Sequence, residues 1–329
     1  MTDDSTACLR CCYFVRINHH PNPLCGIKYP EEIMNDVVLS MKTGYGSFGI
    51  IGGDKRQLYC ARSLSDDGYA VALGGFDKVS QMKNVELATP FEAALMSEII
   101  ILPLPCINNS GCIPDSLSSA DIELTPQLVS AMKGKRIFCG MKDRLEAVCP
   151  ELAKNASDYY MREEFAVCNA VATAEGAIEL AMRSFEGTIN GARCLVCGYG
   201  RIGRALTRIL CAMSADVTVS ARKPSDLAWI ELGGARPVRT ENMYQLGEFD
   251  IIFNTVPAKI LSCVLLAKIA LHAVVIDLAS GEGGVDTYAA DRLGITTHHA
   301  LSLPGKAAPK TAGEIVKKTI YHILEEDDR

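Results

Sequence analysis

The chain has 329 residues, of which 48% are hydrophobic and 22% charged, and its formal net charge is −6. This length predicts two domains, and the composition is typical of a soluble globular protein. The negative charge argues against a general binder of nucleic acid or membrane surfaces, and we find neither a run of about 18 apolar residues nor a secretion signal. Because the 14 cysteines are scattered and several lie in apolar runs, we interpret them as reduced thiols in a cytosol.

Residues 1–46 differ in composition from the rest of the chain. They hold cysteines, adjacent histidines and prolines, namely Cys8, Cys11, Cys12, Cys25, His19, His20, Pro21, Pro23 and Pro30. The spacing fits no standard zinc site, so we expect no bound metal. We predict a poorly ordered N-terminal extension over residues 1–46, and a translation start at Met34 or Met41 is an alternative to a start at Met1.

The first domain is expected to begin with a strand, a glycine turn and a helix. Residues 47–51 predict the strand, and a helix to about Leu64 follows the glycines at positions 52 and 53. Further elements are expected as strands at 69–73, 97–103 and 136–139 and a helix at 124–132. We interpret residues 47–165 as a flavodoxin-like or Rossmann-like substrate domain.

Polar residues follow two of these strands. Arg56 comes after the first strand, and Ser110 and Gly111 lie in the loop after the strand at 97–103. Because open parallel sheets bind ligands outside the carboxyl ends of their strands, we expect these residues to face one cleft.

A long helix and a second domain follow. Residues 168–185 have helical spacing, so we assign 166–190 as a connecting helix. Strands are then expected at 193–197, 217–221, 236–238, 250–254, 273–277 and 295–298. Their alternation with helices predicts a doubly wound parallel sheet over residues 191–308. A last helix, 311–325, is expected to return to the first domain and complete it with residues 309–326. The fold class is therefore α/β, with two doubly wound parallel-sheet domains, the second a Rossmann dinucleotide-binding domain.

A glycine motif opens the second domain. An apolar strand is followed by the sequence G-Y-G-R-I-G and an amphipathic helix, which is the order that a dinucleotide site requires. We expect the first glycine to permit the tight turn, the second to let the backbone approach a pyrophosphate, and the third to let helix and strand pack closely. The predicted cofactor-binding residues of this motif are Gly198, Tyr199, Gly200, Arg201, Ile202 and Gly203.

The next strand bears on the choice of dinucleotide. An NAD site usually places Asp or Glu at its end, where this chain has Ser220, Arg222 and Lys223. A guanidinium can bind a 2′-phosphate, so we predict NADP, with NAD as the alternative. Later loops of the same sheet are also expected to border the cofactor, through Asn254, Thr255, Val256, Pro257 and Asp277.

Several stretches resemble the A subunit of dipicolinate synthase. They are Gly-Gly-Asp-Lys-Arg-Gln (52–57), Gly-Tyr-Gly-Arg-Ile-Gly (198–203), Asn-Thr-Val-Pro (254–257), Asp-Leu-Ala-Ser (277–280) and Leu-Pro-Gly-Lys-Ala-Ala-Pro-Lys-Thr-Ala-Gly (303–313). The resemblance covers about residues 47–325. It implies an enzyme that oxidises dihydrodipicolinate to pyridine-2,6-dicarboxylate by hydride transfer to NADP⁺. It also implies a role in endospore formation, a flavoprotein-like B subunit, and the cytoplasm of the mother cell of a sporulating bacterium.

A dicarboxylate substrate calls for cationic partners. Arg56 and Lys310 are the candidate catalytic and substrate-binding residues, with Ser110, Gly111 and Thr311 as supporting donors. We place Lys310 just before a helix, where the N–H groups of residues 311–313 would share the carboxylate.

Other residues are weaker candidates. Asp277 and Glu175 are candidate general bases, and the sequence does not choose between them. His298 and His299 follow a strand, and ordinary histidines at a strand end are the simpler account.

Two alternative functions stay open. One is a dehydrogenase of small 2-hydroxy acids or amino acids, and the other is a non-catalytic, regulatory NADP-binding subunit. We also expect the chain to form a homo-oligomer.

Overall fold

The computed structural model describes residues 46–245 and 248–327. The predictions made for residues 1–45 lie outside this part of the chain.

The first sheet has six parallel strands in the order β3-β2-β1-β4-β5-β6. The strands are β1 (Ser47–Ile51), β2 (Ala70–Gly74), β3 (Glu86–Ala88), β4 (Ile99–Ile101), β5 (Arg136–Cys139) and β6 (Ala156–Asp158). The central strand β4 is Ile-Ile-Ile, and all three side chains are fully buried. Burial on both faces is typical of a parallel sheet covered by helices on each side.

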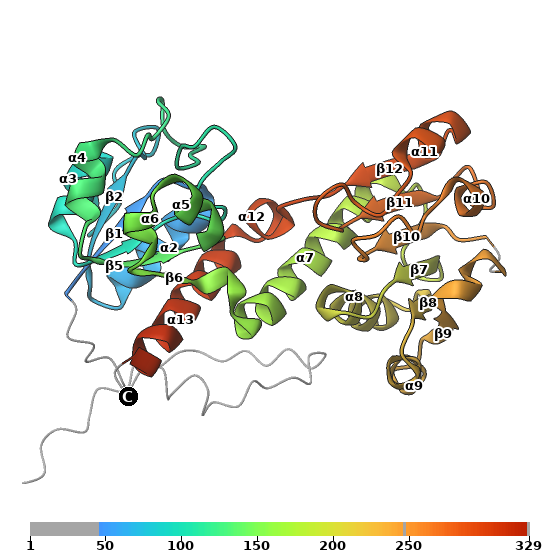
Figure 1. Cartoon of the computed structure of the whole chain (residues 1–329). Coiled ribbons are helices and arrows are strands. Elements are labelled where there is room, and N and C mark those ends of the chain that lie inside the picture. Colours follow the sequence, from blue (N-terminus) through green and yellow to red (C-terminus); the bar gives the residue numbers. More distant parts are fainter. Residues whose placement is uncertain (1–45, 246–247, 328–329) are drawn as a thin grey trace, which may run out of the picture. The chain divides into compact units, whose positions relative to one another are not determined.

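The helices of this domain cover both faces of its sheet (Figure 1). They are α2 (Lys55–Asp66), α3 (Pro90–Met96), α4 (Pro126–Met132), α5 (Lys142–Val148) and α6 (Pro150–Ala153), with a 3₁₀ turn, η1, at Tyr159–Met161. Ala94 of α3 and Leu128 of α4 share a core cluster with Ile100 of β4. Helix α2 lies on the opposite face of the sheet, where α13 (Pro309–Asp327) packs on it.

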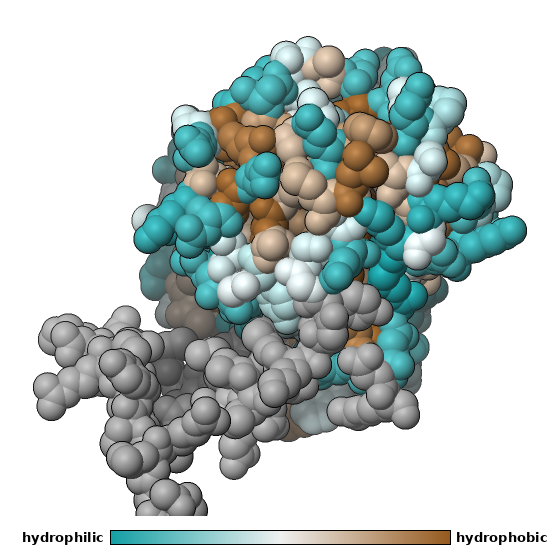
Figure 2. All heavy atoms as spheres, turned by 90° about the vertical axis from the view of Figure 1, so that its left-hand side faces the viewer, coloured by the Kyte–Doolittle hydropathy of each residue, from teal (hydrophilic) through white to brown (hydrophobic). Residues whose placement is uncertain are grey.

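Apolar side chains are exposed on the side of α3 that faces away from the sheet. Phe91, Leu95 and Met96 are among the exposed large hydrophobic residues. Figure 2 looks onto this side of the molecule and shows apolar surface among hydrophilic residues.

The second sheet also has six parallel strands, in the order β12-β11-β10-β7-β8-β9. Its strands are β7 (Arg193–Cys197), β8 (Asp216–Ala221), β9 (Arg236–Arg239), β10 (Ile251–Asn254), β11 (Val274–Asp277) and β12 (Thr296–His299). The helices are α7 (Glu163–Ser184), α8 (Arg201–Ala212), α9 (Pro224–Leu232), α10 (Cys263–Leu266) and α11 (Thr287–Leu293), with a 3₁₀ helix, η2, at Thr240–Gln245. Ala177 of α7 and Leu206 of α8 pack with Val196 on one face, and Leu266 of α10 packs with Leu195 on the other.

Among the described helices, α7 alone is long and apolar enough to cross a membrane by length and composition. The search for apolar runs in the sequence did not single it out. Its residues Ala174, Ala177, Ile178 and Ala181 belong to the core of the second sheet. This helix is therefore explained as a core helix.

Glycines let the C-terminal helices pack closely on their neighbours. The short helix α12 (Leu303–Ala307) lies against α7 at Gly176, where an added Cβ would come 3.0 Å from the Cβ of Ala307. Helix α13 lies against α2 at Gly313, where an added Cβ would come 2.5 Å from the carbonyl oxygen of Arg56.

The predicted fold class is confirmed: the chain is α/β with two all-parallel, doubly wound sheets. The predicted division into a substrate domain, a connecting helix and a cofactor domain stays a prediction. Two details of the sequence interpretation are wrong. β3 and α3 were not foreseen, and the last helix begins at Pro309, so Lys310 lies in its first turn rather than before it.

Candidate functional site

The two sheets share one strand order, and each has its switch point between corresponding strands. In the first sheet β1 lies beside β4, and in the second β7 lies beside β10. Since the connections from such neighbours run in opposite directions, a crevice forms outside their carboxyl ends, where α/β proteins bind ligands. The candidate loops 52–56 and 102–111 follow β1 and β4, and the loops 198–203 and 254–257 follow β7 and β10.

The glycine motif after β7 has the geometry of a dinucleotide loop. Gly198 has a φ of +94°, and an added Cβ would come 2.7 Å from Oγ1 of Thr255 and 2.8 Å from Cγ2 of Val256. At Gly203 a Cβ would overlap the carbonyl oxygen of Gly198. At Gly200 a Cβ would meet no described atom within 4 Å, so open space lies where a pyrophosphate would approach.

The start of α8 lacks the usual side-chain cap. Its N-cap is Gly200, and its first turn carries no acidic residue, only the basic Arg201 and Arg204. Arg201 and Arg204 are paired with the carboxylates of Glu163 and Asp226, but the first N–H groups of the helix have no side-chain cap, which is unfavourable unless an anion is near. The residues present therefore fit a phosphate-bearing cofactor at this place.

The start of α2 in the first sheet is built differently. Its N-cap is Asp54, whose carboxylate accepts a hydrogen bond from the backbone N–H of Arg56 at 2.9 Å, and Gln57 completes a capping box. An added Cβ at Gly52 would come 2.6 Å from Cγ2 of Ile113, so the loop after β4 packs on this turn. At the start of α2 the Asp54 carboxylate thus takes the place of a bound anion, and Ile113 fills the space beside the glycine turn. The corresponding space at Gly200, at the start of α8, is open. The spacing from Asp54 to Gln57 is the sequence signal for this cap, and it was not recognised before the structure showed it.

The loops after β10 and β11 are held together by one carboxylate. Oδ1 of the buried Asp277 accepts hydrogen bonds from Nδ2 of Asn254 at 2.8 Å and from the N–H of Ala279 at 3.1 Å, and Oδ2 accepts one from the N–H of Gly284 at 2.8 Å. Thr255 donates through its hydroxyl to the carbonyl oxygen of Cys197 at 2.8 Å. Asp277 therefore positions the loop beside the glycine turn, and its oxygens are engaged in doing so.

The residues at the end of β8 that were predicted to select the dinucleotide differ in their exposure. Ser220 is fully buried and pairs in register with Cys197 of β7. Arg222 and Lys223 are exposed, and no ion pair holds either of them within the described residues. The two cations are free to meet a ligand, whereas the Ser220 hydroxyl is enclosed.

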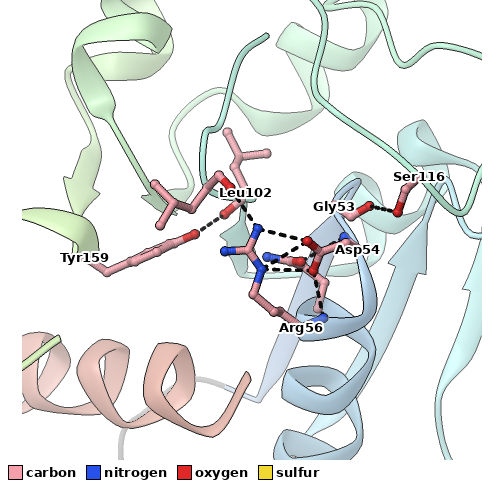
Figure 3. A network of polar contacts seen from close by, with 8 residues as sticks. Gly53, Asp54, Arg56, Leu102, Ser116 and Tyr159 are labelled. Carbon is pink, nitrogen blue, oxygen red and sulfur yellow. Dashed lines mark hydrogen bonds and ion pairs between the residues drawn. The ribbon is translucent and has the colours of Figure 1, made fainter. Parts of the chain in front are cut away.

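Arg56 is held in a polar network at the first switch point (Figure 3). Its Nε and Nη2 bind the Asp54 carboxylate at 2.9 to 3.1 Å, and Nη2 also donates to the carbonyl oxygen of Leu104 at 2.9 Å. Tyr159 donates to the carbonyl oxygen of Leu102 at 3.1 Å. Burial acts to lower the pKa of Arg56, but the hydrogen bond and charge of Asp54 outweigh it and leave that pKa raised.

The stretch 303–313 lies directly on this network. An added Cβ at Gly305 of α12 would come 3.1 Å from Nε of Arg56 and 3.2 Å from Oδ2 of Asp54. The stretches 52–57 and 303–313, the most specific ones in the sequence, therefore meet in space. Lys310 and Thr311 are exposed in the first turn of α13. The N–H of Ala312 donates to the carbonyl oxygen of Ala308 at 2.9 Å, so this one of the three donors expected at 311–313 is engaged within the chain, and the carboxylate site stays a prediction.

The loop after β4 uses most of its own donors. The N–H of Gly111 donates to the carbonyl oxygen of Asn108 at 3.2 Å, and the N–H of Ser110 donates to Oδ1 of the same residue at 2.9 Å. The donor proposed at Gly111 is therefore engaged in this conformation, and Ser110 offers only its hydroxyl.

A half-buried carboxyl lies next to the first glycine turn. The backbone of Asp115 forms an isolated parallel β-bridge with that of Gly53. The Oδ1 atom of Asp115 accepts a hydrogen bond from the N–H of Leu117 at 2.6 Å. Its Oδ2 is buried and has no hydrogen-bond partner among the described residues. Burial, the largest effect, raises the pKa of Asp115 to about 6.

The remaining candidates are Glu175 of α7 and the two histidines of β12, of which His299 pairs in register with Asp277 of β11. Glu175 is exposed on α7, and Nε2 of His298 is buried without a partner among the described residues. Nε2 of His299 lies 3.2 Å from the carbonyl oxygen of Ala279. Within the described residues, no group of His, Cys, Asp and Glu could hold a metal ion.

Comparison with known proteins places this architecture. A family model described as the N-terminal domain of the dipicolinate synthase A subunit matches residues 47–160. The dipicolinate synthase A subunit of Bacillus subtilis (strain 168) is 31% identical over 291 residues, which are 87% of this chain and 98% of the relative. The chain belongs to the family of the dipicolinate synthase A subunit.

Solved structures agree with this family assignment. The crystal structure of the dipicolinate synthase A subunit from Bacillus halodurans matches with a TM-score of 0.78 and 32% identity, over 85% of this chain and 97% of that one. A transhydrogenase from Sinorhizobium meliloti matches with a TM-score of 0.63 and 14% identity, over 85% and 93% of the two chains. The second match shows the shared fold alone. The resemblance found in the sequence is thus confirmed.

Proposed function

We propose that this chain oxidises dihydrodipicolinate to dipicolinate by hydride transfer to NADP⁺. The observation that carries the proposal is the family relationship, which spans 98% of a relative named as the A subunit of dipicolinate synthase. The open, uncapped start of α8 supports a dinucleotide at the second switch point. Loss of one hydride and one proton converts the dihydropyridine ring into the aromatic ring, so the reaction also releases a proton.

The cofactor site is assigned to loops of the second sheet. Gly200 and the first N–H groups of α8 would hold the pyrophosphate, and Arg222 and Lys223 would hold the 2′-phosphate. The loop that begins at Asn254 would lie along the nicotinamide side. When bound, the nicotinamide supplies the hydride acceptor. NAD is the alternative cofactor.

The substrate site is assigned to the first switch point. Arg56 is 13% exposed and tied to Asp54, so it would orient a carboxylate from a fixed position. Lys310 and Thr311 are exposed and would bind a second carboxylate, with the Ser110 hydroxyl as a further donor. Fixed cations of this kind favour one orientation of a planar dicarboxylate, which is the main contribution required for hydride removal.

We further propose the partner and setting that the family name suggests. The B subunit would join this chain in a complex, in addition to self-association into a homo-oligomer. The complex would act in the cytoplasm of the mother cell of a sporulating bacterium.

An absorbance assay tests this function. The purified chain is mixed with enzymatically generated dihydrodipicolinate and NADP⁺, with and without the B subunit, while NADPH and the aromatic product are followed. We expect turnover that Lys310→Ala reduces at least tenfold and that Lys306→Ala, at the neighbouring exposed lysine, leaves unchanged. Turnover only in the mixture would leave two alternatives, an enzyme that depends on the B subunit and a regulatory subunit. Absence of turnover in both mixtures would reject the substrate.

A further inference from the structure

Arg201 at the start of α8 is engaged with an acidic side chain outside its own helix. Its Nε donates to Oε1 of Glu163 at 2.8 Å, and its Nη2 binds Oε2 of the same carboxylate. Glu163 is the first residue of α7. The pair is bidentate, so it uses the two nitrogens that Arg201 would present to a phosphate in the same manner.

The helix dipole explains why this pair forms. A cation in the first turn of a helix faces the positive end of the dipole, which is unfavourable without an anion nearby. No acidic residue of α8 itself lies in that turn. Glu163 therefore supplies negative charge to Arg201, as Asp226 of α9 does to Arg204 at 3.2 Å.

Neighbouring ion pairs fix the position of Glu163. Arg162, immediately before it, binds Glu164 through Nε at 2.7 Å and binds Glu326 of α13 through Nη1 and Nη2 at 2.7 and 2.6 Å. These ion pairs hold the start of α7 against the C-terminal helix α13. The backbone that carries Glu163 is therefore fixed in position beside Arg201.

We propose that Glu163 is an internal competitor of the cofactor pyrophosphate for Arg201. The inference rests on the proposed dinucleotide site. In the free protein the Glu163 carboxylate holds the guanidinium, and in the cofactor complex the pyrophosphate takes it over. Glu163 therefore weakens cofactor binding, and Arg201 is a positioning residue whose partner changes on binding.

The exposure of the pair sets the size of the effect. The Arg201 side chain is 53% exposed and that of Glu163 is 66% exposed. Ion pairs at such exposed positions are weak, so the pair opens easily, and its loss changes affinity by at most about fivefold.

Binding of NADPH, followed by its fluorescence, tests the competition without any turnover. We expect Glu163→Gln to lower the dissociation constant about two- to fivefold. Glu179→Gln is the matched control, since it removes the same charge from an exposed carboxylate of α7 that is paired with Arg183 of the same helix. The control variant should change the dissociation constant of NADPH by less than half as much as Glu163→Gln does.

A double-mutant comparison makes the assignment specific. In an Arg201→Gln background, where affinity is lower, Glu163→Gln should improve binding only by the amount that Glu179→Gln does. Weaker or unchanged binding of Glu163→Gln in the wild-type background would overturn the proposal. Absence of NADPH binding to the wild-type chain would instead reject the dinucleotide site itself.

Discussion

Glycines at the second switch point serve different purposes although they belong to one motif. Gly203 is required by the fold, because any Cβ there would overlap the backbone of Gly198. Gly200 has open space around it and a φ of −78°, which alanine adopts readily. The sequence motif marks both positions equally, and only the structure separates packing from ligand approach.

Alanine substitution should reveal this difference. We expect Gly200→Ala to leave the thermal midpoint within about 2 °C of the wild type and to weaken NADPH binding at least tenfold, because the methyl group fills the phosphate approach. Gly203→Ala should lower the midpoint itself, since the clash is with the chain. Calorimetry and NADPH fluorescence give the two readouts, and undiminished NADPH binding by Gly200→Ala would contradict the assigned site.

At the scale of elements, the helix starts decide which sheet is open to a dinucleotide. Most strands, the doubly wound parallel arrangement and the glycine motif after β7 were predictable, because apolar runs and glycine turns are local signals. The contact of the stretch 303–313 with Asp54 and Arg56 was not predictable, because it joins residues that are far apart in the sequence and no local pattern signals it. Likewise, Arg56 was expected to face the substrate, and its capture by Asp54 depends on how α2 begins.

The packing of α13 on α2 offers a test of one such long-range contact. Gly313→Ala would place a methyl group 2.5 Å from the carbonyl oxygen of Arg56 and 2.9 Å from the amide nitrogen of Cys60. Because both are backbone atoms, the helices must separate, and we expect a loss of about 1–3 kcal/mol in the free energy of unfolding. Lys318→Ala, at an exposed position of the same helix, is the control and should cost less than about 0.5 kcal/mol in urea unfolding.

For the whole molecule, the half-buried carboxyl of Asp115 makes stability depend on pH. Its folded pKa of about 6 lies above the ordinary value of 3.8, because burial disfavours the charged form. The folded state therefore holds this proton more tightly than the unfolded state. The resulting penalty is absent below about pH 4, grows between pH 4 and 6, and is constant above that.

Asp115→Asn should remove this penalty. We expect the variant to be more stable than the wild type by about 1 kcal/mol at pH 8, after allowance for partial solvent screening, and equally stable near pH 4. Urea unfolding across this range measures the difference. A gap between the two proteins that does not change with pH would show that Asp115 keeps an ordinary pKa.

The packing of α13 also has a consequence for synthesis of the chain on the ribosome. The second sheet and its helices are encoded without interruption between residues 163 and 299. The first sheet precedes it in the chain, and its helix α2 packs at Tyr59 and Cys60 on α13, which follows both sheets. This face of α2 can therefore be covered only after residues 309–327 have been synthesised.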